Sequence, residues 1–176
     1  MLKGLNLYLI GMMGVGKSTI GHLLAKELHY RFFDTDNLIQ DVTQKDINTI
    51  FNSAGESTFR QIESQVLAQL SAYTYLVVAT GGGIILKREN WSYLHHGFIV
   101  WLDAPVELLI ARLQNDSTRP LLKDPDPAGK LQTLLAERQP LYAQADLRIP
   151  VSEGETPEEI AQRIITEIPT RLKPVG

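Results

Sequence analysis

Short apolar segments of strand length alternate along the chain with longer segments whose apolar residues recur at helical spacing. Strands are predicted at residues 5–10, 31–33, 75–79, 98–102 and 147–151. Helices are predicted at residues 17–28, 37–43, 47–54, 58–72, 88–95, 106–115, 128–143 and 158–167. The third and fourth strands are almost wholly apolar, which is typical of parallel strands covered on both faces. The pattern therefore predicts a doubly wound α/β fold with a parallel sheet.

Length and composition narrow the class of protein. The chain has 176 residues, which favours one domain, 1–176, over two full-sized ones. Its net charge of −3 argues against a nucleic-acid or membrane-surface partner, and it contains no cysteine. No signal-peptide pattern precedes the first strand, and no apolar run approaches the roughly 20 residues of a membrane helix. We therefore expect a cytoplasmic protein.

A glycine-rich loop follows the first predicted strand. Residues 11–18 read Gly-Met-Met-Gly-Val-Gly-Lys-Ser, which fits the phosphate-binding pattern G-x-x-x-x-G-K-[ST] between a strand and a helix. The alternative is an accidental glycine turn that caps a helix, and the correct flanking elements argue against it. In such loops backbone N–H groups hold the phosphates, the lysine reaches the terminal phosphate and the serine binds magnesium. The motif predicts that ATP binds at Gly14, Val15, Gly16, Lys17, Ser18 and Thr19, and that Mg²⁺ binds at Ser18.

Two carboxylates follow the second predicted strand. Asp34 and Asp36 are two residues apart, so in an extended chain both would point to one side. Beside a phosphate loop such a pair could hold the metal's hydration shell and accept a proton from a substrate hydroxyl. The alternative is that one of them, Asp36 above all, only caps the helix that begins near Asn37.

Three consecutive glycines, Gly81 to Gly83, follow the third predicted strand. The carboxyl ends of parallel strands are where open α/β sheets bind ligands, so a substrate could lie against bare backbone there. The alternative is a tight turn with positive φ, which a single glycine would satisfy.

Three arginines are candidates for anion binding: Arg60, Arg119 and Arg138. Two planar guanidinium groups would suit a substrate carboxylate, and an arginine on a closing loop could neutralise charge on a transferring phosphoryl group. Arg119 lies in the irregular segment 115–127, which we interpret as a surface loop or lid. The alternative for each arginine alone is a solvated surface charge.

Two helix starts are also predicted. Thr156 precedes Pro157 and two glutamates, a strong N-terminal signal. Asp103 ends an apolar run that imitates a metal-binding strand, and we interpret it, with Ala104 and Pro105, as the cap of the next helix.

The ordered set of motifs resembles the shikimate kinase family over residues 5–167. The set comprises residues 11–19, Asp34 to Asp36, Gly55, Glu56, Phe59, Arg60, Glu63, Gly81 to Gly83, Arg119 to Leu122, Arg138 and Tyr142. The resemblance implies transfer of the γ-phosphate of ATP to the 3-hydroxyl of shikimate, with one Mg²⁺, in aromatic biosynthesis.

The same resemblance implies roles for individual residues. Asp36 would hold ring hydroxyls and be the candidate base, Arg60 and Arg138 would hold the carboxylate, and the Gly81–Gly83 backbone would line the pocket. Asp34 would lie in the outer shell of the magnesium ion. The phosphoryl group would be stabilised by Lys17 and Arg119, and the adenine flanked by Arg112 and the loop around Pro157.

The fold implied is a five-stranded parallel sheet in the order 2-3-1-4-5, with a helical substrate-binding insert at about 36–63, a lid at about 114–126 and a monomeric state. Two other functions stay open. One is a kinase for a different acceptor, such as gluconate or a nucleoside monophosphate, which the paired arginines and the three glycines disfavour. The other is a catalytically inactive nucleotide-binding regulatory module.

Overall fold

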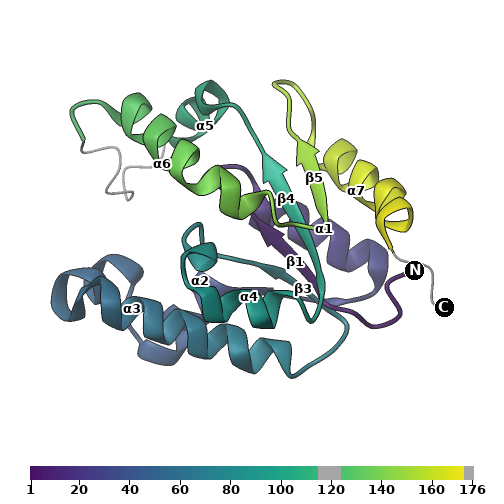
Figure 1. The fold of residues 1–176 in the computed structure, drawn as a ribbon, viewed down its shortest axis with the longest axis horizontal. Helices are drawn as coiled ribbons and strands as arrows, with labels where there is room; N and C mark the ends of the chain where they lie inside the picture. Colours follow the sequence, from purple (N-terminus) through teal and green to yellow (C-terminus); the bar gives the residue numbers. More distant parts are fainter. Residues whose placement is uncertain (115–123, 173–176) are drawn as a thin grey trace.

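A five-stranded parallel sheet forms the centre of the molecule (Figure 1). The structure is a computed structural model, and it describes residues 1–114 and 124–172. The strands are β1 Leu7–Ile10, β2 Arg31–Asp34, β3 Leu76–Ala79, β4 Phe98–Asp103 and β5 Leu147–Pro150. Their order is β2-β3-β1-β4-β5, and every neighbouring pair is parallel. The predicted α/β class and strand order are confirmed.

The three central strands carry the hydrophobic core. All four residues of β1 and all four of β3 are buried, and so are the first five of β4. The edge strand β5 instead alternates buried and exposed residues, as expected for a strand with one covered face and one exposed face. The uninterrupted apolar runs in the sequence therefore correspond to the strands that are covered on both faces.

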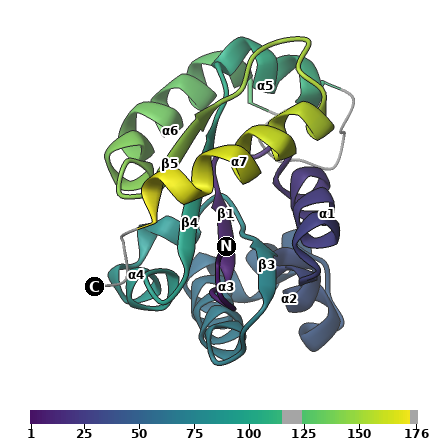
Figure 2. The same cartoon turned by 90° about the vertical axis from the view of Figure 1, so that its right-hand side faces the viewer.

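Helices cover both faces of the sheet. Helices α1 and α7 contact each other on one face, and α3 and α4 contact each other on the other (Figure 2). Helix α6 packs against α5 and against the short 3-10 helix η1. The helical elements are α1 Lys17–Leu28, α2 Thr35–Thr43, α3 Ile47–Ser71, η1 Ile84–Leu86, α4 Arg88–Leu94, α5 Val106–Leu113, α6 Pro127–Tyr142 and α7 Pro157–Arg171.

Helix α3 contains a break at Gly55. This residue has φ 85° and ψ 168°, which no helical residue adopts, so the chain forms two helical segments on either side of it. The prediction of separate helices at 47–54 and 58–72 is therefore confirmed, because the non-helical residue Gly55 lies between the two segments. The second segment carries Arg60 and Glu63, and the break sets its direction independently of the first.

Both predicted helix starts are confirmed, because α7 begins at Pro157 and α5 at Val106, but the capping role predicted for the Asp103 side chain is wrong. The Thr156 side chain accepts a hydrogen bond from the Glu159 N–H while the Glu159 carboxylate accepts one from the Thr156 N–H, a complete capping box. Asp103 does not cap α5, whose first turn has no side-chain cap. Instead Arg148 on the neighbouring strand β5 donates two hydrogen bonds to Oδ2 of Asp103, at 2.8 and 2.5 Å.

None of the helices among the described residues combines the length and the apolar content that a membrane span needs.

Candidate active site

The candidate site residues gather at the carboxyl edge of the sheet. Because all five strands are parallel, the segments that follow them meet at one edge. The phosphate loop follows β1, Asp34 ends β2, and the three glycines follow β3. Residues that are far apart in the sequence are therefore brought to one end of the fold.

The phosphate loop has the backbone that its glycines predict. Gly14 and Gly16 have φ of 81° and 102°, values that residues with a side chain rarely adopt. Gly16 is also the N-cap of α1, so the loop leads directly into the positive end of that helix. Backbone N–H groups at a helix N-terminus form an anion site, which is the arrangement that the sequence predicts.

Lys17 and Ser18 lie at the first turn of α1. The Nζ of Lys17 donates hydrogen bonds to the carbonyl oxygens of Gly11, at 2.6 Å, and Met12, at 3.0 Å, so the ammonium group lies over the loop. The hydroxyl of Ser18 donates to Oδ2 of Asp34, at 2.5 Å. This contact joins the phosphate loop to the end of β2 and brings two oxygen donors together.

The two carboxylates after β2 do not share an extended segment. Helix α2 begins at Thr35, and Asp34 is its N-cap, with Oδ1 accepting hydrogen bonds from the N–H groups of Asp36 and Asn37. The capping residue is therefore Asp34 and not Asp36, and the premise that both point to one side of an extended chain is wrong. Asp36 belongs to the first turn of α2, and its carboxylate faces the glycines after β3.

Each of the three glycines faces a different charged side chain. A Cβ at Gly81 would lie 2.8 Å from Oδ1 of Asp36, and one at Gly82 would lie 3.4 Å from a guanidinium nitrogen of Arg138. A Cβ at Gly83 would overlap the guanidinium of Arg60. The structure therefore brings together a carboxylate from α2, an arginine from α3 and an arginine from α6 around one segment of bare backbone.

None of these three glycines has positive φ. The alternative interpretation, a tight turn that needs left-handed backbone, is therefore wrong. What the glycines supply is space, since any larger residue at position 81 or 83 would collide with a charged group. This is the expected property of a segment that forms the wall of a binding site.

Arg60 is held by an acidic partner on its own helix. Glu63 lies three residues further along α3, and Arg60 donates to its Oε1 at 3.0 Å. Glu63 is fully buried, and its Oε2 has no hydrogen-bond partner among the described residues. Burial raises the pKa of Glu63 to about 7, against the opposing effect of Arg60, and the nearby Asp36 raises it further.

Of the remaining predicted site residues, the structure describes Arg112 and Pro157 but not Arg119. Arg112 on α5 donates to the carbonyl of Val15 at 2.8 Å, so it lies beside the phosphate loop. Pro157 is the first residue of α7, next to its N-cap Thr156. Arg119 and most of the predicted lid lie outside the described residues.

Two residues of the site have no role in the sequence-based interpretation, although both belong to the quoted motifs. They are Glu63, described above, and Tyr142, whose buried hydroxyl donates to the carbonyl of Gly82 at 2.9 Å. Their spacing from the arginines, three residues from Arg60 and four from Arg138, is the signal that could have found them, because such pairs share a helix face.

Comparison with known proteins identifies the family. A family model described as "Shikimate kinase" matches residues 13–169. Shikimate kinases of Nostoc sp. and Nostoc punctiforme are 66% and 64% identical to the chain, which they match over 98% and 99% of its length and 96% of their own. The structure of shikimate kinase from Acinetobacter baumannii in complex with shikimate is 41% identical, with a TM-score of 0.91 over 96% of both chains. The chain therefore belongs to the shikimate kinase family, and the kinase function predicted from the ordered motifs is confirmed.

Proposed function

We propose that the residues gathered at the carboxyl edge of the sheet transfer the γ-phosphoryl group of ATP to the 3-hydroxyl of shikimate. The observation that carries this proposal is the meeting of Asp36, Arg60 and Arg138 at the Gly81–Gly83 segment, beside the phosphate loop. A carboxylate and two guanidinium groups suit an acceptor that has hydroxyls at one end and a carboxylate at the other.

The nucleotide half of the site is the phosphate loop. The backbone of Gly14 to Thr19 would hold the phosphates, and Lys17 would exchange its carbonyl contacts for oxygens of the transferring group. Arg112 would contact the nucleotide from α5, since it already lies beside the loop, and Pro157 would flank the adenine. The assignments in the loop follow the phosphate-binding motif, and those of Arg112 and Pro157 follow the family resemblance.

The donor atoms around Ser18 fit a magnesium ion. The Ser18 hydroxyl and the Asp34 carboxylate are hard oxygen donors 2.5 Å apart, and Mg²⁺ in kinases takes few protein ligands because phosphates and waters complete its shell. We assign Ser18 as the direct ligand and Asp34 to the outer shell. The ion would neutralise phosphate charge as the bond to ADP breaks.

The acceptor half would orient and activate the hydroxyl. Arg60 and Arg138 would bind the shikimate carboxylate, so that the 3-hydroxyl points to the phosphate loop. Asp36 would accept the hydroxyl proton as the acceptor oxygen bonds to phosphorus and the bridging oxygen leaves with ADP. The glycine backbone would pack against the ring, because no side chain intervenes there.

The proposal also covers the domain organisation, the lid, the oligomeric state and the cellular location. It would be one domain, residues 1–176, in which about 36–63 bind the acceptor and about 114–126 close over the site. Arg119 would come from that lid to stabilise the transferring phosphoryl group, and closure would exclude water and prevent wasteful hydrolysis of ATP. We propose a monomeric, cytoplasmic enzyme whose partners are ATP and shikimate, with neither nucleic acid nor a membrane as partner.

A coupled assay of ADP release tests the reaction. The protein is supplied with ATP and Mg²⁺, alone and with shikimate, gluconate or adenosine monophosphate. We expect turnover only with shikimate, and loss of turnover when the metal is removed with a chelator. If none of the three acceptors increases the rate of ADP release while the protein still binds ATP, the regulatory module would instead be favoured.

Two matched pairs of variants test the residue roles. Arg138→Ala should weaken shikimate binding by at least about tenfold and leave ATP binding nearly unchanged, whereas Arg171→Ala, at the exposed end of α7, should change neither. Lys17→Ala should abolish phosphoryl transfer, whereas Lys26→Ala, exposed in the last turn of the same helix, should not. Equal loss of both affinities in Arg138→Ala would refute the acceptor role, and near-normal turnover in Lys17→Ala would refute the phosphate role.

A further inference from the structure

The hydroxyl of Tyr142 lies between the two halves of the candidate site. Tyr142 is the last residue of α6 and is completely buried. Its hydroxyl donates to the carbonyl of Gly82 at 2.9 Å and lies 3.7 Å from Sδ of Met12 in the phosphate loop. A hydroxyl has one proton to donate, and the carbonyl is the better and nearer acceptor.

The same hydroxyl has Arg138 as a neighbour. Arg138 precedes Tyr142 by four residues, so both side chains lie on one face of α6. A guanidinium nitrogen of Arg138 lies close enough to Gly82 that an added Cβ would be 3.4 Å away from it. Burial raises the pKa of the Tyr142 hydroxyl, and both the charge of Arg138 and a hydrogen bond with it act against this increase. The Arg138 guanidinium and the Tyr142 hydroxyl therefore meet at Gly82, whose carbonyl accepts the tyrosine proton.

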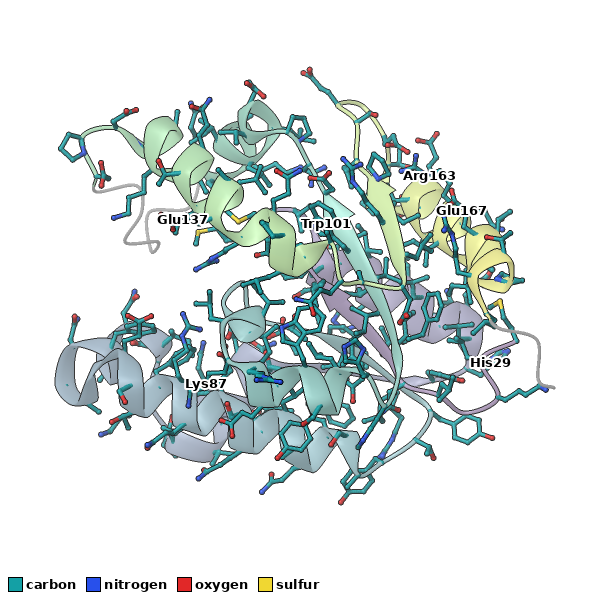
Figure 3. The ribbon with its side chains drawn as sticks, viewed as in Figure 1. His29, Lys87, Trp101, Glu137, Arg163 and Glu167 are labelled. Carbon is teal, nitrogen blue, oxygen red and sulfur yellow. The ribbon has the colours of Figure 1, made fainter. Side chains whose placement is uncertain are left out.

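Packing fixes the tyrosine ring independently of these polar contacts. The ring stacks on Trp101 of β4, with 5.7 Å between ring centroids and 19° between ring planes. Figure 3 labels Trp101. Trp101 is itself buried, and the guanidinium of Arg148 lies 5.1 Å from its ring centroid. A phenylalanine at position 142 would keep this stacking and lose only the hydroxyl.

We propose that Tyr142 is a positioning residue for the acceptor, because its hydroxyl fixes the Gly82 carbonyl, against which the Arg138 guanidinium lies, beside the phosphate loop. The inference rests on the proposed acceptor role of Arg138. Tyr142 touches no reacting atom in this proposal. It acts by restricting two groups that would contact the acceptor, so its removal lets both adopt other positions at the expense of acceptor affinity.

The variant Tyr142→Phe tests the role of the hydroxyl. A single intramolecular hydrogen bond corresponds to roughly a three- to tenfold change in an equilibrium constant. We therefore expect the KM for shikimate to rise by about that factor, while the KM for ATP stays within about twofold. A direct titration of shikimate at saturating ADP should give the same change in Kd.

Tyr8→Phe is the matched control. Tyr8 is likewise completely buried, and its hydroxyl accepts a hydrogen bond from Asn6 on the amino-terminal side of β1, remote from the carboxyl edge. Its substitution also removes one buried tyrosine hydroxyl, so it reports what a purely structural loss does. Tyr8→Phe should leave the KM for shikimate unchanged, even where it lowers the Tm as much as Tyr142→Phe does.

A double-mutant cycle separates this inference from the proposed function. If Tyr142 acts through Arg138, then Tyr142→Phe in the Arg138→Ala background should raise the KM for shikimate less than it does in the parent protein. An unchanged KM in Tyr142→Phe, or equal increases for shikimate and ATP, would overturn the positioning role. Arg138→Ala alone with normal shikimate binding would instead overturn the proposed function. Should Tyr142→Phe not fold, the hydroxyl is a structural requirement and the proposal fails as well.

Discussion

Glu63 should make the stability of the protein fall as pH rises through the neutral range. Its side chain is fully buried, one carboxylate oxygen has only Arg60 as partner and the other has none among the described residues. Burial raises the pKa of Glu63 from 4.5 to about 7. Between these two values the folded protein holds a proton that the unfolded chain has released.

The difference between the folded and unfolded pKa of Glu63 sets the size and the direction of the change in unfolding free energy with pH. One pKa unit corresponds to about 1.4 kcal/mol, so a shift of about 2.5 units corresponds to roughly 3 kcal/mol. Because the folded state binds the extra proton, raising the pH favours unfolding. The contribution of Glu63 is at its most favourable below pH 4.5 and is lost as the pH rises through about 7.

Urea unfolding across this pH range measures the effect, with Glu63→Gln as the perturbation. Glutamine resembles the protonated carboxyl and does not titrate, so the difference in unfolding free energy between the parent and the variant isolates Glu63. We expect the parent to lose about 3 kcal/mol relative to Glu63→Gln between pH 4.5 and about pH 8. Glu56→Gln is the matched control, since Glu56 pairs with the same Arg60 at 3.5 Å but its side chain is 65% exposed.

Three results would refute this reasoning. A difference that does not vary with pH would mean that Glu63 titrates alike in the folded and unfolded states. A parent that gains stability with pH would mean that the ion pair with Arg60 outweighs the cost of burying the charge. If the difference in unfolding free energy between the parent and Glu56→Gln varied with pH as much as that between the parent and Glu63→Gln, the effect would belong to Arg60 or to the whole helix.

Three further substitutions test, in turn, a steric contact at Gly83, the backbone conformation at Gly55 and the ion pair of Asp103. Gly83→Ala should displace the Arg60 guanidinium and raise the KM for shikimate about tenfold, with little change in the KM for ATP, which steady-state kinetics would show. Gly55→Ala should lower the unfolding free energy by about 1–2 kcal/mol, measured with urea, because its φ of 85° disfavours a side chain although nothing lies within 4 Å; an unchanged stability would contradict this. Asp103→Asn should change the unfolding free energy by less than about 1 kcal/mol, because the Arg148 side chain is 56% exposed, and a larger loss would make the pair structurally important.

Much of the fold could be predicted because its signals are local. The apolar runs of β1, β3 and β4 are buried on both faces, so length and composition alone identified them. The capping box at Thr156 lies within four residues, and its sequence signal is equally direct. The strand order came from the family resemblance, since periodicity does not say which strands are neighbours.

Predictions failed where a distant partner competes with a local pattern. Asp103 has the sequence context of a helix cap, but β5 places Arg148 next to it, and a charged partner on the neighbouring strand takes its carboxylate. Asp34 and Asp36 were assigned to extended backbone, but Asp34 satisfies the first N–H groups of α2, which starts the helix two residues earlier than expected. In both cases the local pattern was a valid signal for a helix start, and the residue that caps or pairs differs from the one that the pattern predicted.

The Gly81–Gly83 segment explains why the acceptor half of the site was only partly readable from sequence. Three glycines in a row suggest a turn, yet their backbone is not left-handed, and what they provide is room for charged groups from α2, α6 and α3. Those groups lie up to about a hundred residues apart, so no local pattern links them to the glycines. A side chain added at Gly83 would displace the Arg60 guanidinium, whereas one added at Gly81 would displace Asp36 and also meet Oε2 of Glu63, 3.0 Å away. Substitution of Gly83 therefore tests the carboxylate-binding role proposed for Arg60 without removing its charge, which substitution of Arg60 itself would do.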